Sequence, residues 1–325
     1  MNTPPAAFSR RSFMLSTAAL AANAVPIVAG AAEALQPHVA PRDRTYRVLG
    51  VPLRSGSLYP GSEDDARAYR DAGLLKRLQA AGCNATDEGD VAIPNYLPHH
   101  AIPPIRNWPG PRIAWDCISE RIEPWLHQTG SVPLLIGCDC SVVVGTTQAL
   151  ARSGATEIHV LYVDGDFDAA EPSSGRVQSA ASTAVWLLTH ESPFWSGPHL
   201  QLSQVTAIGS SNPAQSVAGL RSLTLADIRR LGATEAARQA LADVPEAAAV
   251  ILHFDIDVLD DKEFPAAYFP HSSGLNLAEA SELFGALSRD PRIRIIEVSE
   301  YAALRDVDRS RAAALSELLA RRLAP

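Results

Sequence analysis

Residues 161–168 read LYVDGDFD, and this stretch decides how the rest of the chain is interpreted. An apolar run ends here in three carboxylates at alternate positions, Asp164, Asp166 and Asp168. A short apolar run of this kind is typical of a strand buried on both faces of a parallel sheet. Because taking an unpaired carboxylate out of water is costly, three acids at the end of a core strand predict a bound cation.

The pattern recurs at residues 250–260, which read VILHFDIDVLD. Asp255 and Asp257 again lie two positions apart after an apolar run, and Asp260 follows. Ile256, between the two acids, is expected to point back into the core because side chains alternate along a strand. Two strand ends that each offer carboxylates two residues apart predict a cage for one or two divalent ions.

Apolar runs and helical stretches alternate along the chain on both sides of these motifs. The expected strands are 45–53, 132–136, 157–163, 204–208, 249–254 and 294–298, and the expected helices are 64–81, 121–128, 141–152, 179–189, 234–241, 277–287 and 309–321. Ser141 is expected to be the N-cap of its helix. Strands that alternate with helices predict an α/β fold with one mainly parallel sheet covered on both faces. Ligands bind beyond the carboxyl ends of such strands, where the acid clusters lie.

The first 34 residues predict an export signal and its cleavage region. Residues 9–14 read SRRSFM, a twin-arginine signature, and an apolar stretch of small residues follows at 15–29. This stretch is shorter and richer in alanine than a membrane span, which needs about 20 apolar residues. We therefore expect a periplasmic or secreted protein with no membrane segment in its mature form, and one domain over residues 40–325.

The composition excludes some partners. A net charge of -8 argues against binding to nucleic acid, and 46% hydrophobic residues can supply a large core. Four cysteines in an exported protein could form two disulfides. For Cys138 and Cys140 this bond would be strained, because the two residues lie only two positions apart.

Four motifs together resemble one family. They read GCDCS at 137–141, DGDFD at 164–168, HFDIDVLDD at 253–261 and EVSEY at 297–301. In order and approximate spacing they are similar to the GGDHS, DAHxD, SxDxDxxDP and EVNP segments of the arginase/agmatinase (ureohydrolase) family. The resemblance covers nearly all of the chain after the leader.

The resemblance implies a three-layer α/β/α sandwich with two manganese ions bridged by a hydroxide that attacks a guanidinium carbon. It places the metal ligands at Cys140, Asp164, Asp166, Asp168, Asp255 and Asp257. It gives Asp168 a catalytic role as well, in which its carboxylate hydrogen-bonds the hydroxide. Glu297 is expected to pair with the substrate guanidinium, as a catalytic positioning residue and a substrate-binding residue. The resemblance also allows a homo-oligomer.

Three departures from the family pattern change the expected chemistry. Cys140 and Asp166 stand where the family has histidine ligands, and a thiolate favours zinc, iron or nickel. Manganese remains the expected ion, with one or two ions bound. Gln178 stands where the family has a histidine that is thought to protonate the leaving amine, and glutamine cannot deliver a proton. His253, His271 or solvent are the alternative proton sources.

Residues 174–178 are the expected substrate-binding loop. Ser174 matches a substrate-contacting serine, Gln178 can orient a group, and Arg176 can meet an acidic group on the substrate. The leading hypothesis is a metal-dependent hydrolase of non-peptide C–N bonds in small guanidino or amidino compounds. The competing hypothesis is a catalytically inactive arginase-fold protein that binds a metal or a small ligand. A deacetylase-like zinc activity ranks last, because the paired histidines it needs have no match here.

Overall fold

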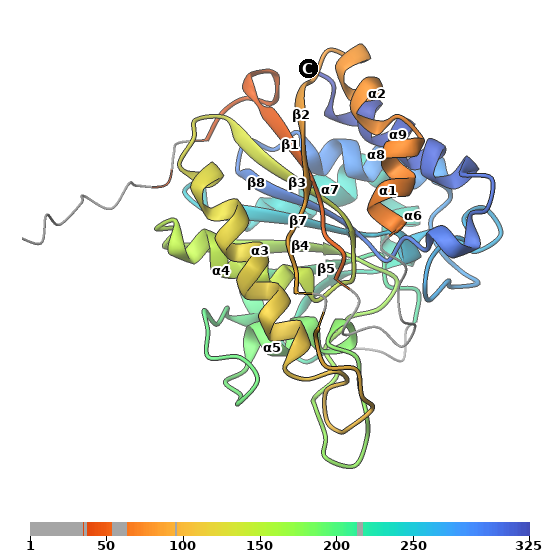
Figure 1. Ribbon diagram of the computed structural model, residues 1–325. Helices are drawn as coiled ribbons and strands as arrows, with labels where there is room; N and C mark the ends of the chain where they lie inside the picture. The colour runs from red at the N-terminus through yellow and green to blue at the C-terminus, as the bar shows by residue number, and fades with distance from the viewer. Residues whose placement is uncertain (1–34, 36–37, 54–63, 95, 213–216) are drawn as a thin grey trace, which may run out of the picture. The chain divides into compact units, whose positions relative to one another are not determined.

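Eight parallel strands form one sheet in the computed structural model, which describes residues 35, 38–53, 64–94, 96–212 and 217–325 (Figure 1). The predicted export signal lies outside these described residues. The strands are β1 Thr45–Gly50, β2 Asn84–Asp90, β3 Ser131–Cys138, β4 Ile158–Val163, β5 Val205–Ile208, β6 Arg221–Leu223, β7 Ala249–Asp255 and β8 Ile293–Ser299. Their order across the sheet is β2-β1-β3-β8-β7-β4-β5-β6, and every neighbouring pair is parallel.

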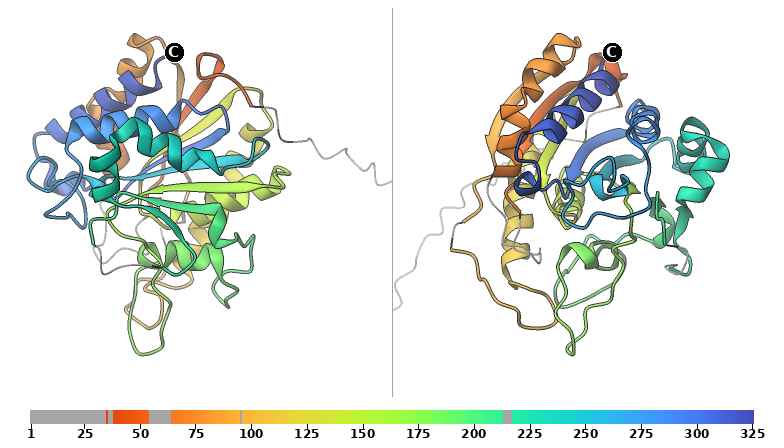
Figure 2. Two further views of the ribbon diagram at one scale, coloured as in Figure 1. Left: turned by 180° about the vertical axis from the view of Figure 1, so that it is seen from behind. Right: turned by 90° about the vertical axis from the view of Figure 1, so that its right-hand side faces the viewer.

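Helices cover both faces of the sheet, which confirms the predicted α/β sandwich with a parallel sheet. One face carries α3 Gly110–Leu126, α4 Val142–Arg152 and α5 Ala184–Thr189. The other face carries α1 Asp64–Asp71, α2 Leu74–Ala80, α6 Leu225–Leu231, α7 Ala233–Ala242, α8 Leu277–Ser288 and α9 Ser310–Leu323. Helix α3 crosses in front of the sheet in Figure 1, whereas α7 and α8 lie in front of it in the left view of Figure 2.

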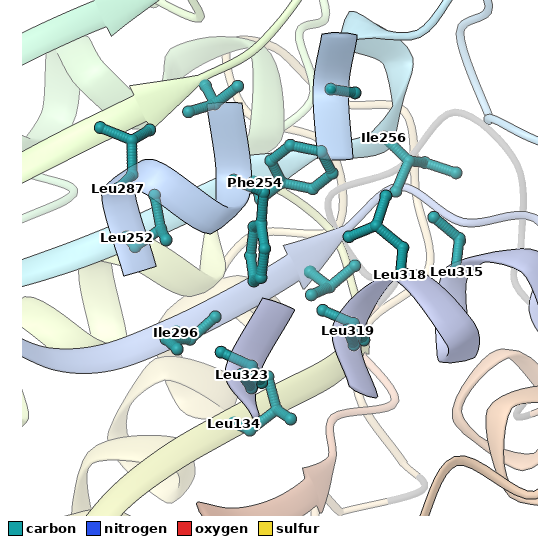
Figure 3. Close-up of a cluster of buried hydrophobic side chains, with 14 of the residues drawn as sticks. Leu134, Leu252, Phe254, Ile256, Leu287, Ile296, Leu315, Leu318, Leu319 and Leu323 are labelled. Carbon is teal, nitrogen blue, oxygen red and sulfur yellow. The ribbon is translucent and has the colours of Figure 1, made fainter. Parts of the chain in front are cut away.

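The central strands are apolar on both sides because each side packs against a helix layer. In β3, Leu134 and Ile136 point to the layer of α8 and α9, while Leu135 points to the layer of α3 and α4. Figure 3 shows the first of these two cores, in which Leu252, Phe254 and Ile296 of the strands meet Leu287 of α8 and Leu315, Leu318, Leu319 and Leu323 of α9. The continuous apolar runs of the sequence reflect this burial on two faces.

The sequence did not predict three short elements, namely β2, β6 and α6. Strand β2 reads NATDEGD and pairs only with β1, so its side chains are mostly exposed and carry no apolar alternation. Strand β6 has three residues at the opposite edge, and α6 has seven residues. Charged residues suit an edge strand because they discourage pairing with another chain. Edge position therefore explains why the two strands lack apolar periodicity, and α6 is too short to show a clear helical period.

Two predicted helices have different limits. The helix expected at 64–81 is two helices, and Gly73 between them has a left-handed φ of 76°. The helix expected at 121–128 is only the last part of α3, which begins at Gly110. Its first turn contains a proline, which is well tolerated at that position of a helix.

Ser141 precedes α4 as predicted, but its hydroxyl makes no cap hydrogen bond to that helix. The hydroxyl instead donates to Oδ1 of Asp139 at 2.6 Å and accepts from Nε1 of Trp115 at 3.1 Å. Ser141 therefore ties the start of α4 to α3. Among the described residues, no helix is both long enough and apolar enough to cross a membrane.

Candidate active site

Four neighbouring strands, β3, β8, β7 and β4, end at one place at the centre of the sheet. Cys140 follows β3, Asp164 follows β4, Asp255 ends β7 and Glu300 follows β8. Parallel strands present their carboxyl ends at the same edge, so these side chains meet although they lie far apart in the sequence. The sheet order thus builds a polar site from four separate segments.

The two Asp-x-Asp motifs adopt the same local turn. Oδ1 of Asp164 accepts the amide of Asp166 at 2.5 Å, and Oδ1 of Asp255 accepts the amide of Asp257 at 2.7 Å. Aspartate favours such turns because its side chain can accept a backbone N–H two residues ahead. Each motif therefore holds its second acid beside its first, and a further bond from the amide of Gly165 to Oδ1 of Asp257, at 3.0 Å, joins the two turns.

One group of possible ligands is fully buried. Cys140, Asp164, His253 and Asp255 each place a donor atom within 4.8 Å of the others. Sγ of Cys140 lies 2.5 Å from Oδ2 of Asp255 and 4.0 Å from Oδ2 of Asp164. These contacts place Cys140, which follows β3, against the acids of β4 and β7.

A second group lies nearer the surface. Asp166, Asp257 and His271 also have donor atoms within 4.8 Å of one another. Nε2 of His271 lies 3.5 Å from Oδ2 of Asp166 and 3.4 Å from Oδ2 of Asp257. His271 lies outside the four sequence motifs, in the loop between β7 and α8, and was not predicted as a ligand.

Asp168 is held by an aromatic pair. The hydroxyl of Tyr162 donates to Oδ2 of Asp168 at 2.6 Å, and the Tyr162 ring stacks on the imidazole of His253 with centroids 4.3 Å apart. Asp168 and Glu300 both adopt left-handed backbone conformations, with φ of 47° and 58° respectively. Non-glycine residues in this region are uncommon and cluster at functional sites.

The electrostatics of the site are those of acids crowded together out of water. Burial, reinforced by neighbouring acids, raises the pKa of Asp164 and Asp255 well above the ordinary range. Burial also raises the pKa of Asp168 to about 8. The adjacent carboxylates of Asp166 and Asp257 raise the pKa of His271 to about 10. Positive charge at this place would stabilise the ionised acids.

A cavity of about 230 Å³ opens beside these groups. Of the residues predicted from sequence, it is lined by Cys140, Asp166, Asp168, Arg176, Gln178, Asp255 and Asp257. Asp164 lies beneath this surface with 2% of its area exposed. Ser174 is exposed in the same loop and is not among the lining residues, so its substrate contact stays a prediction.

Glu297 is fully buried in β8 and is not among the residues that line the cavity. Its carboxylate accepts from the Thr146 hydroxyl, and its Oε2 lies 2.6 Å from Nδ1 of His253. The expected pairing of Glu297 with a guanidinium therefore stays a prediction. Glu300, three residues later, does line the cavity, and its Oε1 accepts from the Cys140 amide at 3.3 Å. Its position directly after β8 could have identified Glu300 from the sequence, because ligands bind beyond the carboxyl ends of such strands.

Cys138 and Cys140 are free thiols. Sγ of Cys138 contacts the carbonyl of Val298 at 3.6 Å, whereas Sγ of Cys140 faces the acids. Burial and the nearby acids raise the pKa of both thiols well above the ordinary value. Because Cys140 forms no disulfide, its sulfur remains available as a ligand, which it would be as the thiolate.

A sequence profile of the arginase family matches residues 44–324, which is most of the chain. The chain belongs to the arginase family. The arginase of Bacillus caldovelox is 25% identical to it over 287 residues, which cover 84% of this chain and 95% of that protein.

Solved structures of arginase-family proteins share the fold. Arginase from Bacillus subtilis matches with a TM-score of 0.75 at 21% identity, covering 87% of this chain and 99% of that one. Formiminoglutamase from Trypanosoma cruzi, solved with Mn²⁺, matches with a TM-score of 0.67 at 18% identity, covering 87% and 93%. At these identities the structural likeness shows the architecture alone.

The side chains of this arginase-family site fit a divalent cation. Carboxylate oxygens suit hard ions such as manganese, while the thiol of Cys140 and an imidazole suit zinc, cobalt or nickel. The raised pKa values of Asp164 and Asp255 show that ionising these acids is costly in the buried site, and a bound cation would offset that cost. Nε2 of His271 is buried, has no hydrogen-bond partner among the described residues, and lies between Oδ2 of Asp166 and Oδ2 of Asp257.

Proposed function

We propose that this arginase-family chain is a metal-dependent hydrolase of non-peptide C–N bonds in small guanidino or amidino compounds. The observation that carries the proposal is the meeting of two Asp-x-Asp turns and Cys140 at the floor of one cavity. Family membership adds support, because relatives named arginase and formiminoglutamase share the architecture. The cavity is smaller than a typical drug-sized pocket, which favours a small substrate.

The chain offers separate residues for holding the metal and for holding the substrate. The metal would be held by Cys140, Asp164, Asp166, Asp168, Asp255 and Asp257. A divalent ion there would supply positive charge and a water molecule of lowered pKa at neutral pH. Tyr162 acts as a positioning residue, because its hydroxyl and its stacking on His253 fix the orientation of Asp168.

Two charged residues on the cavity wall would orient the substrate. Glu300 presents a carboxylate to the cavity and can pair with a guanidinium or amidinium cation. Arg176 lines the same cavity from the loop after β4 and can pair with an acidic group at the substrate's other end. The proposed substrate therefore carries a cationic amidine and a carboxylate.

Gln178 favours the competing hypothesis of an inactive metal-binding or ligand-binding protein. Its side-chain Oε1 accepts the amide of Ser173 at 3.2 Å, and its backbone pairs with the segment around Ile105. Gln178 thus has a structural role in the loop and cannot deliver a proton.

A turnover screen tests the proposal. Purified protein is loaded separately with Mn²⁺, Co²⁺, Zn²⁺ or Ni²⁺ and incubated with arginine, hydroxyarginine, agmatine, guanidinobutyrate and formiminoglutamate. Release of urea, hydroxyurea, ammonia or formamide is measured, and Asp255→Asn is the control because it removes a buried acid from the proposed ligand set. We expect metal-dependent turnover of a compound with a carboxylate, lost in the control.

The substrate roles are tested on the compound that turns over. Glu300→Gln is expected to raise KM about tenfold or more, because an uncharged amide binds an amidinium less tightly. Glu297→Gln leaves the cavity wall intact and is expected to change KM less. Metal binding without turnover of any compound in the screen would instead establish the inactive alternative.

A further inference from the structure

The spacing of three side chains beside the cavity matches a metal coordination sphere. Nε2 of His271 lies 3.4 Å and 3.5 Å from oxygens of Asp257 and Asp166. These distances are long for hydrogen bonds, which favour 2.7–3.2 Å for a nitrogen donor. Two donors that each lie about 2.0–2.2 Å from one ion are separated by roughly 3.0–3.5 Å. Both distances from Nε2 therefore suit ligands of one ion, and ligand atoms of all three side chains lie within 4.8 Å of one another.

Gly165 makes room for the imidazole. A Cβ atom at this position would lie 2.5 Å from Cδ2 of His271 and 2.9 Å from its Nε2. The family motif DAHxD has alanine and histidine where this chain has Gly165 and Asp166. The chain thus lacks a methyl group at the place where an imidazole arrives from another loop, and it lacks the local histidine that such an imidazole would replace.

The backbone of His271 is anchored beside β7. Its carbonyl accepts the amide of Asp261 at 2.9 Å, and it forms an isolated bridge with Asp260. Leu275, four residues later, accepts the amide of Asp260 at 2.9 Å and donates to Val258 at 2.8 Å. The loop therefore presents His271 at a defined position, although 24% of its side chain is exposed.

We propose that His271 is the imidazole ligand of a divalent ion that binds at Asp166 and Asp257. The inference rests on the metal requirement of the proposed function and assigns a ligand outside the four sequence motifs. A lone imidazolium that merely neutralises two carboxylates is the competing explanation. The two explanations differ in one measurable respect, because a counter-charge competes with a metal ion whereas a ligand recruits it.

The test measures metal binding directly. Wild type, His271→Ala, His271→Arg and Gly165→Ala are loaded with Co²⁺, freed of excess metal by gel filtration, and analysed for cobalt per chain. We expect each variant to lose one equivalent, or to bind it at least tenfold more weakly. His271→Arg keeps a positive charge without an imidazole, and Gly165→Ala keeps every proposed ligand but obstructs the ring.

Two matched controls accompany the variants. His190→Ala removes an exposed histidine that stacks on Trp186, and Gly175→Ala adds a methyl group where only Oγ of Ser173, at 3.8 Å, comes within 4 Å. Both are expected to bind as much cobalt as the wild type. Circular dichroism of each variant verifies that it folds.

Proton NMR of the cobalt protein gives a second measurement. A hyperfine-shifted, exchangeable imidazole proton is expected in the wild type and absent from His271→Ala. Unchanged cobalt content in all three variants, or a wild type that retains no cobalt, would overturn the inference. Turnover plays no part in these measurements, so an inactive wild type that loses one ion in His271→Ala supports the inference while the proposed function fails. If the wild type is active and His271→Ala keeps all its cobalt, the proposed function stands and the inference fails.

Discussion

At the scale of single residues, this protein concentrates buried acids at the carboxyl end of its sheet, and Asp65 is one that does not line the cavity. Asp65 is 1% exposed near the start of α1. Its Oδ1 accepts the amide of Ala303 at 2.8 Å, and its Oδ2 accepts the hydroxyl of Tyr268 at 3.2 Å. Burial raises the pKa of Asp65 to about 8, although the Ala303 amide and Arg309 oppose the shift. Asp65 therefore links α1 to the segments of Tyr268 and Ala303 and makes the stability of the protein depend on pH.

The pH dependence has a definite sign. The pKa of Asp65 in the folded protein exceeds the unfolded value of about 3.9, so the folded state binds the proton more tightly. Its contribution to stability is complete below that lower value and is lost as the pH rises through about 8. Asp65→Asn removes the titration, so its melting temperature is expected to rise relative to wild type between pH 5 and pH 9.

Thermal unfolding monitored by circular dichroism across this pH range checks the prediction. Across this range, the difference in free energy of unfolding between Asp65→Asn and wild type is expected to change by on the order of 2–4 kcal/mol. Asp71→Asn, at the exposed other end of α1, is the control and should show a difference that does not vary with pH. A constant difference for Asp65→Asn would contradict the assignment of a buried, protonated acid.

At the scale of elements, the position of Cys140 depends on how closely α4 approaches α3. Helix α4 begins two residues after Cys140, and Gly145 lies in its second turn. A Cβ atom at Gly145 would meet the backbone of Trp115 in α3, at 2.9 Å from its oxygen and 3.0 Å from its Cα. The glycine therefore allows a contact between two helix backbones that a larger residue would prevent.

Gly145→Ala is expected to destabilise the protein by about 1–3 kcal/mol, because the helices must separate. Helix propensity alone predicts the opposite, a gain of about 1 kcal/mol. Gly285→Ala in α8 is the matched control, because the added methyl group meets the flexible side chain of Arg322 rather than backbone. Urea denaturation of both variants measures the difference. Equal changes in the free energy of unfolding would show that the close packing at Gly145 does not contribute to stability.

At the scale of the whole molecule, the acids at the ends of β4, β7 and β8 would oppose folding when ionised, and a cation bound as proposed would offset this cost. Removing metal with a chelator is therefore expected to lower the melting temperature, and adding Mn²⁺ or Co²⁺ to the chelated protein is expected to raise it. An ion at 100 times its dissociation constant would contribute about 2.7 kcal/mol per site. Differential scanning calorimetry at several metal concentrations checks this. Asp255→Asn is the control with a reduced response, and a wild-type melting temperature independent of metal would contradict the proposed site.

Export of the whole chain is a separate prediction, which depends on residues outside the described structure. The paired arginines at 10 and 11 stand before an apolar stretch of small residues. Replacing both with lysine keeps the charge but is expected to hold the protein in the cytoplasm. Fractionation of cells that express each form measures this. Equal amounts of both forms in the periplasm would contradict twin-arginine export.

The sequence by itself determined the α/β fold, the central strands and the acids at their ends. Burial on two faces leaves continuous apolar runs in β4 and β7, and each Asp-x-Asp turn forms between acids two residues apart, so both signals are local. Cys140 could be predicted to meet these acids because neighbouring parallel strands end at one edge of the sheet.

Only the tertiary structure decided the outer wall of the site. His271 comes from a loop with no periodic pattern, and only the three-dimensional path of that loop places it against Gly165. Glu300 rather than Glu297 lines the cavity, because Glu297 lies within β8 with its carboxylate against His253 whereas Glu300 follows the end of the strand. Such contacts depend on how distant segments pack together, and a local pattern of residues does not contain that information.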